Sequence, residues 1–273
     1  RLKASEEQAK VRGKPEKFAD HYTQATLFFE SQTATEQAHI AAAFRFELSK
    51  VTVPAIRQRM LASLRNASQA LAREVATGLG IATLPEPMPR ALARPDKPEV
   101  TKSPALSLTA RPGDGSIKGR KVALLVAPGV DAGLLDLHAA LFAAGAVPCF
   151  VGPHIGPVPP AGGGEIDADM SLENSPGFLF DALVLPDGEA AVAALLKDPH
   201  TMDFINDQYR HCKSILVLGE SSRLIDKAGL SATLASGEAD PGLIMGSSGA
   251  ADADAFIAAI AQHRHFVREA AAV

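Results

Sequence analysis

Ser221 follows an apolar run at the kind of corner where many hydrolases carry a nucleophile. The stretch Lys213–Arg223 reads KSILVLGESSR, which predicts a buried strand, a sharp turn and the start of a helix. A serine elbow reads Gly-x-Ser-x-Gly, and its second glycine gives room for close backbone approach. Arg223 stands where that second glycine belongs, so the motif is incomplete.

Covalent catalysis by Ser221 would also require an acid and a histidine. In the chain order of the elbow hydrolases, Asp252 or Asp254 with His263 or His265 are the available candidates. We expect these residues to lie on a surface-patterned terminal helix, and nothing in the sequence brings them to Ser221. The favoured interpretation is that Ser221 caps a helix. A hydrolase using the corner Gly219–Ser221, with Ser221 or Glu220 as its reactive group, is the alternative.

Two further corners carry residues that suit a ligand site. Gly129 and Asp131 lie in APGVDAG, and Asp187 lies in LPDGEAA, each directly after an apolar run. Neither corner has the Gly-x-Gly-x-x-Gly dinucleotide pattern, and the chain has no Walker A loop. We expect Gly129 to ease a tight turn, Asp131 to cap the next helix, and Asp187 to form a turn with Gly188. A small-molecule crevice near Gly129, Asp131, Asp187 and Gly219 is the alternative.

Metal and thiol chemistry find little support. A His-x-His pair at His263 and His265 would direct its rings to different sides of a helix, and no His-Glu-x-x-His is present. Cys149 and Cys212 match no metal or redox spacing. We expect both to be buried thiols in a reducing compartment, which favours a cytoplasmic protein.

The composition is that of a soluble globular protein. The chain has 273 residues, a formal net charge of −4 and 47% hydrophobic residues. No stripe of Lys and Arg predicts nucleic-acid binding, and no apolar run is long enough to cross a membrane. No signal peptide opens the chain, and its first residue is Arg1, so we expect a fragment or a processed product.

Three regions differ in pattern. Residues 1–80 are helical in pattern: Pro15 opens a first helix through Glu30, Thr33 and Glu36 form a capping box, and Pro54 and Ser68 begin two more. Residues 81–118 contain seven prolines and no periodicity, as expected of a disordered linker or of an extended arm lying on another surface. We call them the Pro-rich arm.

Residues 119–273 alternate between apolar runs and amphipathic helices. KVALLVAP, AVPCFVG, FDALVLPDG, SILVLG and GLIMG predict strands, and a Gly-rich stretch, AGGGEIDADMSL, predicts a turn or hairpin. This alternation predicts a doubly wound, mainly parallel α/β domain with right-handed crossovers. The helices of residues 1–80 carry apolar groups on more than one face, so we expect them to pack on something outside this chain or on another subunit.

The helical region resembles the last helices of the monofunctional haem catalases. In that family an Asp-(Asp/His)-(Phe/Tyr)-x-Gln-Ala segment leads into helices that end in Val-Ala-x-Gly-Leu-Gly. An α/β domain joined by a long Pro-rich arm is similar to the large-subunit catalases. These append a flavodoxin-like domain related to class I glutamine amidotransferases and PfpI-type proteases. The matching residues are Asp20, Gln24, Ala25, Val75, Ala76, Gly78, Leu79 and Gly80.

The resemblance implies that the corner at Gly219 has lost a catalytic pair. PfpI-type relatives carry K-P-I-x-x-I-C-H-G, with a nucleophilic cysteine followed by histidine. Laid on this chain, the cysteine position holds Gly219 and the histidine position holds Glu220. The acidic partner of those relatives falls near Leu134, and Cys212 precedes the strand. Covalent catalysis therefore lacks its nucleophile and its base.

The resemblance also implies a parent protein that disproportionates hydrogen peroxide to water and oxygen with a haem held by a tyrosine. Neither Tyr22 nor Tyr209 lies in the Arg-x-x-x-Tyr-x-Asp ligand helix of that family, and the distal-histidine segment is missing. We therefore expect no haem and no catalase activity in this chain alone. The implied partners are the haem-binding β-barrel of the parent chain and the other subunits of a homotetramer. The implied roles are stability, folding, assembly or access to the haem channel.

Overall fold

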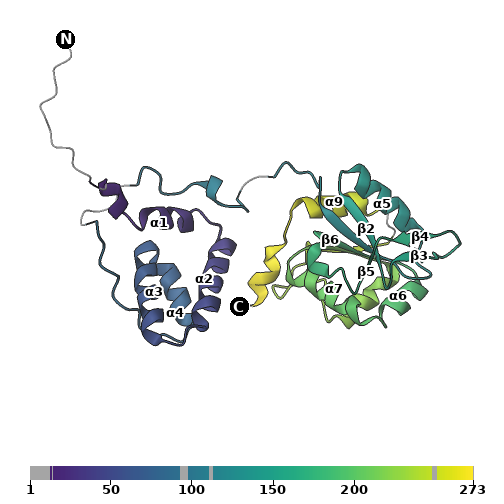
Figure 1. The fold of residues 1–273 in the computed structure, drawn as a ribbon. Coiled ribbons are helices and arrows are strands. Elements are labelled where there is room, and N and C mark those ends of the chain that lie inside the picture. The colour runs from purple at the N-terminus through teal and green to yellow at the C-terminus, as the bar shows by residue number, and fades with distance from the viewer. Residues whose placement is uncertain (1–12, 14, 93–97, 111–112, 248–250, 273) are drawn as a thin grey trace, which may run out of the picture. The chain divides into compact units, whose positions relative to one another are not determined.

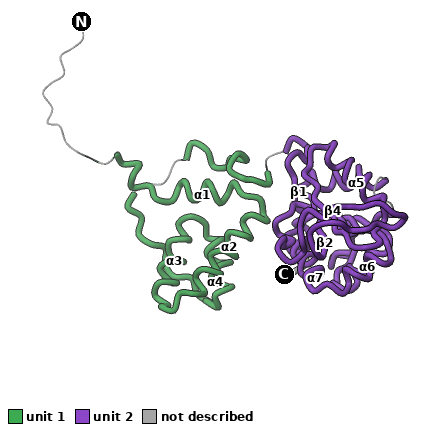
Figure 2. Tube along the Cα trace, turned by 45° about the vertical axis from the view of Figure 1, so that its right-hand side comes forward, with its two compact units in different colours: residues 1–112 green, residues 113–273 purple. Residues whose placement is uncertain are grey.

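The computed structural model describes residues 13, 15–92, 98–110, 113–247 and 251–272. Contacts between Cα atoms divide the chain into two compact units, Arg1–Pro112 and Gly113–Val273 (Figure 2). We call them the helical unit and the α/β unit. Each has a hydrophobic core of its own.

Local capping signals begin most helices of the helical unit. The capping box at Thr33 is confirmed, because its Oγ1 accepts the Glu36 N–H while the Glu36 carboxylate accepts the Thr33 N–H. Pro54 is the first residue of its helix, and Ser68 Oγ accepts the Leu71 N–H at 3.3 Å. The elements are η1 (Glu16–Ala19), α1 (Thr23–Glu30), α2 (Ala34–Ser49), α3 (Pro54–Ala67), α4 (Gln69–Gly78) and η2 (Pro104–Leu106).

The continuous first helix predicted from Pro15 to Glu30 is wrong. A 3₁₀ turn ends at Ala19, and Asp20 is extended, with φ −84° and ψ 95°. The Asp20 carboxylate accepts the N–H groups of Tyr22 and Thr23 at 3.3 and 3.0 Å. A short acidic side chain that bonds the backbone just downstream competes with helix continuation, which explains the break.

The described residues of the Pro-rich arm up to residue 110 lie on the helical unit. Its first half follows α3: Asn66 Nδ2 donates to the Met88 carbonyl at 2.8 Å, and Met88 N donates to the Ala62 carbonyl at 3.1 Å. Arg90 Nε donates to Asn66 Oδ1 at 3.1 Å. Its second half crosses α1 and the start of α2 (Figure 1). The arm is therefore an extended segment held by hydrogen bonds where it is described.

The α/β unit is built on a six-stranded sheet in which all paired strands are parallel. The strand order is β5-β2-β1-β6-β7-β8. Long apolar runs form its centre because both faces are covered, and every residue of β6 and β7 is buried. The strands are β1 (Lys121–Leu125), β2 (Val147–Gly152), β5 (Met170–Ser171), β6 (Ala182–Leu185), β7 (Ser214–Leu218) and β8 (Leu243–Gly246).

Helices cover both faces of this sheet (Figure 1). On one face α5 contacts β2 and α9, and α9 contacts β7; on the other, α7 contacts β6, β7 and α8, and α6 contacts α8. The predicted parallel α/β organisation is therefore confirmed. The helices are α5 (Gly133–Ala143), α6 (Glu189–Leu195), α7 (Pro199–Arg210), α8 (Ser222–Lys227) and α9 (Ala253–Ala261), with 3₁₀ turns η3 (Gly177–Leu179), η4 (Gly219–Ser221) and η5 (Phe266–Ala272).

The Gly-rich stretch forms the predicted hairpin. Strands β3 (Gly156–Val158) and β4 (Ile166–Ala168) pair antiparallel on either side of residues 159–165. None of the helices that the structure describes is both long and apolar enough to span a lipid bilayer.

Candidate functional site

The corner after β7 is a sharp turn from the strand into η4, and it begins at Gly219. Gly219 adopts φ +46°, a left-handed conformation that glycine tolerates best. A Cβ atom at this position would lie 2.3 Å from the carboxylate of Asp187. Any side chain here, a cysteine included, would have to displace that carboxylate.

The carboxylate of Asp187 fills this space and accepts hydrogen bonds from the loops that follow β6 and β7. It follows β6, and its Oδ1 accepts the N–H groups of Gly188 at 2.7 Å and of Glu220 at 3.0 Å. Backbone donors from two loops, one of them directly after the nucleophile position, are the type of group that stabilises an oxyanion in acyl transfer. In this chain both donors already bind an internal carboxylate. This arrangement stabilises the corner, and the N–H groups of Gly188 and Glu220 are both already hydrogen-bonded to Asp187.

Ser221 lies at the predicted helix start but does not cap it. It is fully buried, and its Oγ donates a hydrogen bond to the Pro186 carbonyl. The N–H groups of α8 receive no bond from this side chain, so the predicted capping role is wrong. A buried hydroxyl whose proton is committed to a carbonyl is a poor nucleophile. Glu220 is exposed beside it and lies 3.8 Å from the guanidinium of Arg223.

The corners at Gly129 and Asp187 come together as the sequence indicated. Asp131 N donates to the Asp187 carbonyl at 3.0 Å, and a Cβ at Gly188 would lie 2.4 Å from the Gly129 carbonyl oxygen. Asp131 is not the N-cap of α5, which is Ala132; its Oδ1 instead accepts the N–H of Gly133 at 2.8 Å. The three loops are closely packed at the carboxyl ends of β1, β6 and β7, and ligand binding there remains a prediction.

Of the residues nominated for a triad, Asp252 lies at the same end of the sheet as Ser221, whereas His265 lies at the opposite end. Asp252 lies near the carboxyl end of β8, where its Oδ2 accepts the Ser247 N–H at 2.9 Å. His265 lies near the amino end of β7, with its Nε2 2.9 Å from Ser214 Oγ. Ser221 is at the opposite end of that strand. The expectation that His263 and His265 lie on a helix is wrong: α9 ends at Ala261, and both follow in irregular backbone.

A cluster of buried polar side chains lies at the amino end of β7, and the sequence pattern did not predict it. Arg268 Nε donates to Asp240 Oδ2 at 2.7 Å, and its Nη1 donates to the Lys213 carbonyl at 2.7 Å. Lys213 Nζ donates to the carbonyls of Phe178 and Phe180. No local sequence pattern predicts these hydrogen bonds, because the bonded residues are 28 to 55 positions apart in the chain.

Burial sets the ionisation of this cluster. It lowers the pKa of Lys213 to about 8, with Arg264 adding to the effect, and lowers the pKa of His265. Burial raises the pKa of Cys212 to about 11, and it also raises the pKa of Cys149. Both thiols are free and buried, as the sequence predicted, and neither is activated as a thiolate. The hydrogen bonds of the cluster hold His265 and Arg268 at the amino end of β7.

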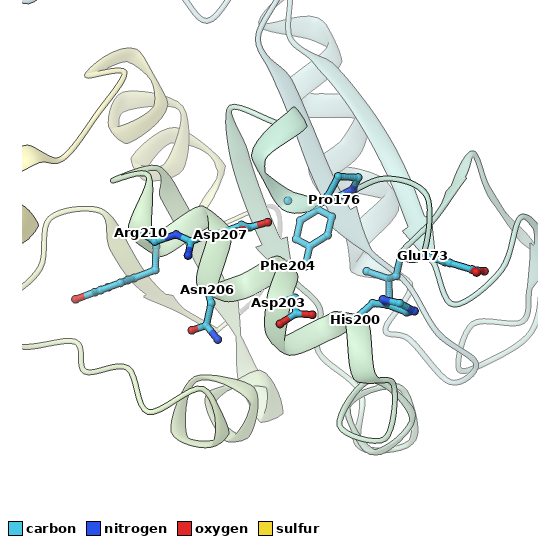
Figure 3. A pocket seen from close by; sticks show the side chains of 11 residues that line it. Glu173, Pro176, His200, Asp203, Phe204, Asn206, Asp207 and Arg210 are labelled. Carbon is cyan, nitrogen blue, oxygen red and sulfur yellow. Dashed lines mark hydrogen bonds and ion pairs between the residues drawn. The ribbon is translucent and has the colours of Figure 1, made fainter. Parts of the chain in front are cut away.

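A separate cavity of about 710 Å³ lies between α7 and the segment that follows β5 (Figure 3). Its polar groups diverge instead of meeting at one point: Figure 3 shows Glu173 directed away from Asp203 and Asn206. Asp207 is already paired with Arg210 at 2.6 Å. The cavity lacks a convergent set of polar groups.

Comparison with protein families accounts for both units in order. Residues 15–79 match the family described as catalase-related immune-responsive. Residues 118–270 match the C-terminal domain found in long catalases. The chain belongs to the long-catalase C-terminal family.

Curated relatives of this long-catalase C-terminal chain are much longer than it is. It is 40% identical to Catalase C of Rhizobium meliloti (strain 1021) and 39% identical to Catalase HPII of Pseudomonas putida. These matches cover 97% and 96% of the chain but only 37% and 35% of the relatives. Catalase HPII of Mycobacterium avium is 37% identical over 94% of the chain and 37% of its own length. The chain thus spans little more than a third of these catalases.

Tyr209 of the long-catalase C-terminal chain does not fit the role of a haem ligand. A tyrosine that ligates iron must give up its proton, but burial and the nearby Asp240 raise the pKa of Tyr209. The Arg268 guanidinium lies 4.4 Å from the centre of its ring and covers that face. Among the residues that the structure describes, no group of three His, Cys, Asp or Glu side chains is placed to hold a metal ion.

Proposed function

We propose that this chain is the non-catalytic C-terminal region of a haem catalase whose parent protein disproportionates hydrogen peroxide. The observation that carries the proposal is the Asp187 carboxylate, which fills the nucleophile position at Gly219 beside Glu220. The ordered pair of family matches supports the parent's identity. In this proposal the haem belongs to the rest of the parent chain.

The proposed partners are the haem-binding β-barrel of the parent and other subunits of a homotetramer. Support comes from the helical unit, on which several large apolar side chains are exposed. Such a surface suits a role in stability, folding and assembly in a cytoplasmic protein. The most exposed large apolar side chains of this unit are Phe18, Phe28, Phe46, Val53, Val100 and Leu108.

We also propose that the α/β unit is flavodoxin-like and descends from the fold shared by class I glutamine amidotransferases and PfpI-type proteases. The order of its five longer strands, β2-β1-β6-β7-β8, corresponds to the 2-1-3-4-5 order of flavodoxin-like sheets and supports this assignment. A hydrolase or binding module at Gly219–Ser221 is disfavoured, because Ser221 is buried and Asp187 holds the backbone donors.

Oxygen release from peroxide tests this function. The purified chain should release no oxygen above a heat-denatured control and should show no Soret band after expression with excess haem. The full parent should do both, and removal of this region should lower its thermal stability or its tetramer yield. Oxygen release by the chain alone would overturn the proposal, as would labelling of Ser221 by an acyl-fluoride probe that Ser221→Ala abolishes.

A further inference from the structure

Residues 98–110 lie across the junction of α1 and α2 and are bonded to it repeatedly. Ser103 N donates to Ser31 Oγ at 2.8 Å, and Gln32 Nε2 donates to the Leu106 carbonyl at 3.1 Å. Both contacts join segments more than 70 residues apart in the sequence. They place this stretch, which we call the strap, on the helical unit.

Glu36 makes the densest contacts with the strap. Its Oε2 accepts a hydrogen bond from Ser107 Oγ at 2.6 Å, and its Oε1 accepts the N–H groups of Leu108 at 2.9 Å and Thr109 at 3.2 Å. The same Oε2 accepts the Thr33 N–H in the capping box. Ser107 is fully buried under these contacts. Hydrogen bonds to a carboxylate are stronger than those between neutral groups.

We propose that Glu36 fastens the strap to the start of α2, and that this fastening keeps the chain that joins the two units short. With the strap in place, residues 111–116 alone connect it to Ile117, which is buried in the α/β unit. Such a connection spans at most about 20 Å. With the strap released, residues 91–116 would connect the units, with a limit of about 90 Å.

Glu36 Oε1 bonds only the strap, whereas Oε2 bonds both Thr33 of the capping box and Ser107 of the strap. A glutamine at position 36 still completes a capping box through its amide oxygen. Its NH₂ group cannot accept the N–H groups of Leu108 and Thr109. Glu36→Gln therefore removes strap contacts while α2 keeps its cap. Thr109→Asp tests the same contact from the strap side, because it places a second carboxylate beside Glu36.

Trypsin provides a direct readout. Within residues 91–116, Arg94, Lys97 and Arg111 are each followed by proline, which trypsin does not cleave, whereas Lys102 is followed by Ser103. The Lys102–Ser103 bond is therefore the single tryptic site of this segment. Release of the strap frees the Ser103 N–H from Ser31 and exposes that bond to the protease.

The experiment compares cleavage of that bond in the full chain and its variants under native conditions. Glu36→Gln and Thr109→Asp should each accelerate it at least about tenfold, since one hydrogen bond to a charged group corresponds to roughly that factor. Glu47→Gln, an exposed site on the same helix, should stay within about twofold of wild type. Thr109→Asn has the shape of the aspartate variant without its charge and also loses the hydroxyl contact with Thr33, so it should accelerate cleavage less than Thr109→Asp does. The radius of gyration should increase in the first two variants.

Wild-type cleavage rates in both Glu36→Gln and Thr109→Asp would overturn the proposal. Equal acceleration by Glu47→Gln would also overturn it, because it would indicate general loosening of α2. Thr109→Asp loses the contact of the Thr109 hydroxyl with Thr33 Oγ1 but leaves Thr33 and Glu36, the two members of the capping box, in place. It therefore tests the strap even where Glu36→Gln weakens the helix.

Discussion

The carboxylate of Asp187 lies where a side chain at residue 219 would project. All three carboxylate atoms are 2.3 Å from the ideal Cβ position of Gly219. The strand-end corner is thus filled by an acidic side chain from the loop that follows the neighbouring strand β6.

The contribution of Lys213 to the stability of the α/β unit should rise between pH 8 and pH 10.5. Its pKa in the folded chain is about 8, against an ordinary value of 10.5, so the unfolded chain binds more protons between these values. Below pH 8 the cost of burying the ammonium group is fully present; it falls as pH rises through this window. Lys213→Met should abolish the increase, measured by urea unfolding at several pH values.

The exposed Lys197 provides the matched control for that experiment. Lys197→Met should leave the pH profile of the wild-type chain unchanged. A Lys213→Met profile that still rises between pH 8 and pH 10.5 would assign the effect to another group.

Loss of either partner in the buried pair Arg268–Asp240 should destabilise the α/β unit strongly. Their side chains are 3% and 0% exposed, so the remaining partner is left buried and uncompensated. We expect Arg268→Met and Asp240→Leu each to cost about 3–5 kcal/mol, and the double variant to cost less than the sum. Urea unfolding followed at an α/β-unit probe measures this, with the exposed pair Lys50–Glu47 as the control. Additive losses would contradict the pairing.

Glu36 should make the helical unit acid-sensitive. Burial opposes ionisation, but hydrogen bonds from Ser107, Thr33 and Thr109 lower its pKa to about 2, from an ordinary 4.5. A depressed carboxyl pKa stabilises the fold above the unfolded value and loses that contribution as pH falls from about 4.5 to 2. Glu36→Gln should flatten the acid transition of the helical unit in this range, measured by helix circular dichroism. A transition of unchanged steepness would contradict the assignment.

Features fixed by neighbouring residues were predictable from the sequence. The capping box at Thr33, the helix starts at Pro54 and Ser68, and the buried strands follow from short-range patterns. The break at Asp20 is also local, but an aspartate inside an amphipathic pattern does not announce whether its side chain will bond the backbone.

Features that depend on the folded chain were not predictable. Asp187 lies 32 residues before Gly219, and only the parallel pairing of β6 with β7 brings them together. The sequence predicts His265 on a surface-patterned terminal helix, whereas its burial beside Ser214 depends on the end of the sheet that it meets. The folded sheet also places His265 and Ser221 at opposite ends of β7, so the residues nominated for a triad do not meet.

A double-mutant cycle between Asp187 and Gly219 tests the central claim most directly. Gly219→Ala should destabilise the chain by at least about 2 kcal/mol, from left-handed backbone strain together with displacement of a hydrogen-bonded carboxylate. In the Asp187→Ala background the same substitution should cost at least about 1 kcal/mol less, because only the strain remains. Equal costs of Gly219→Ala in the two backgrounds, measured by urea unfolding, would contradict the claim that Asp187 occupies the nucleophile position.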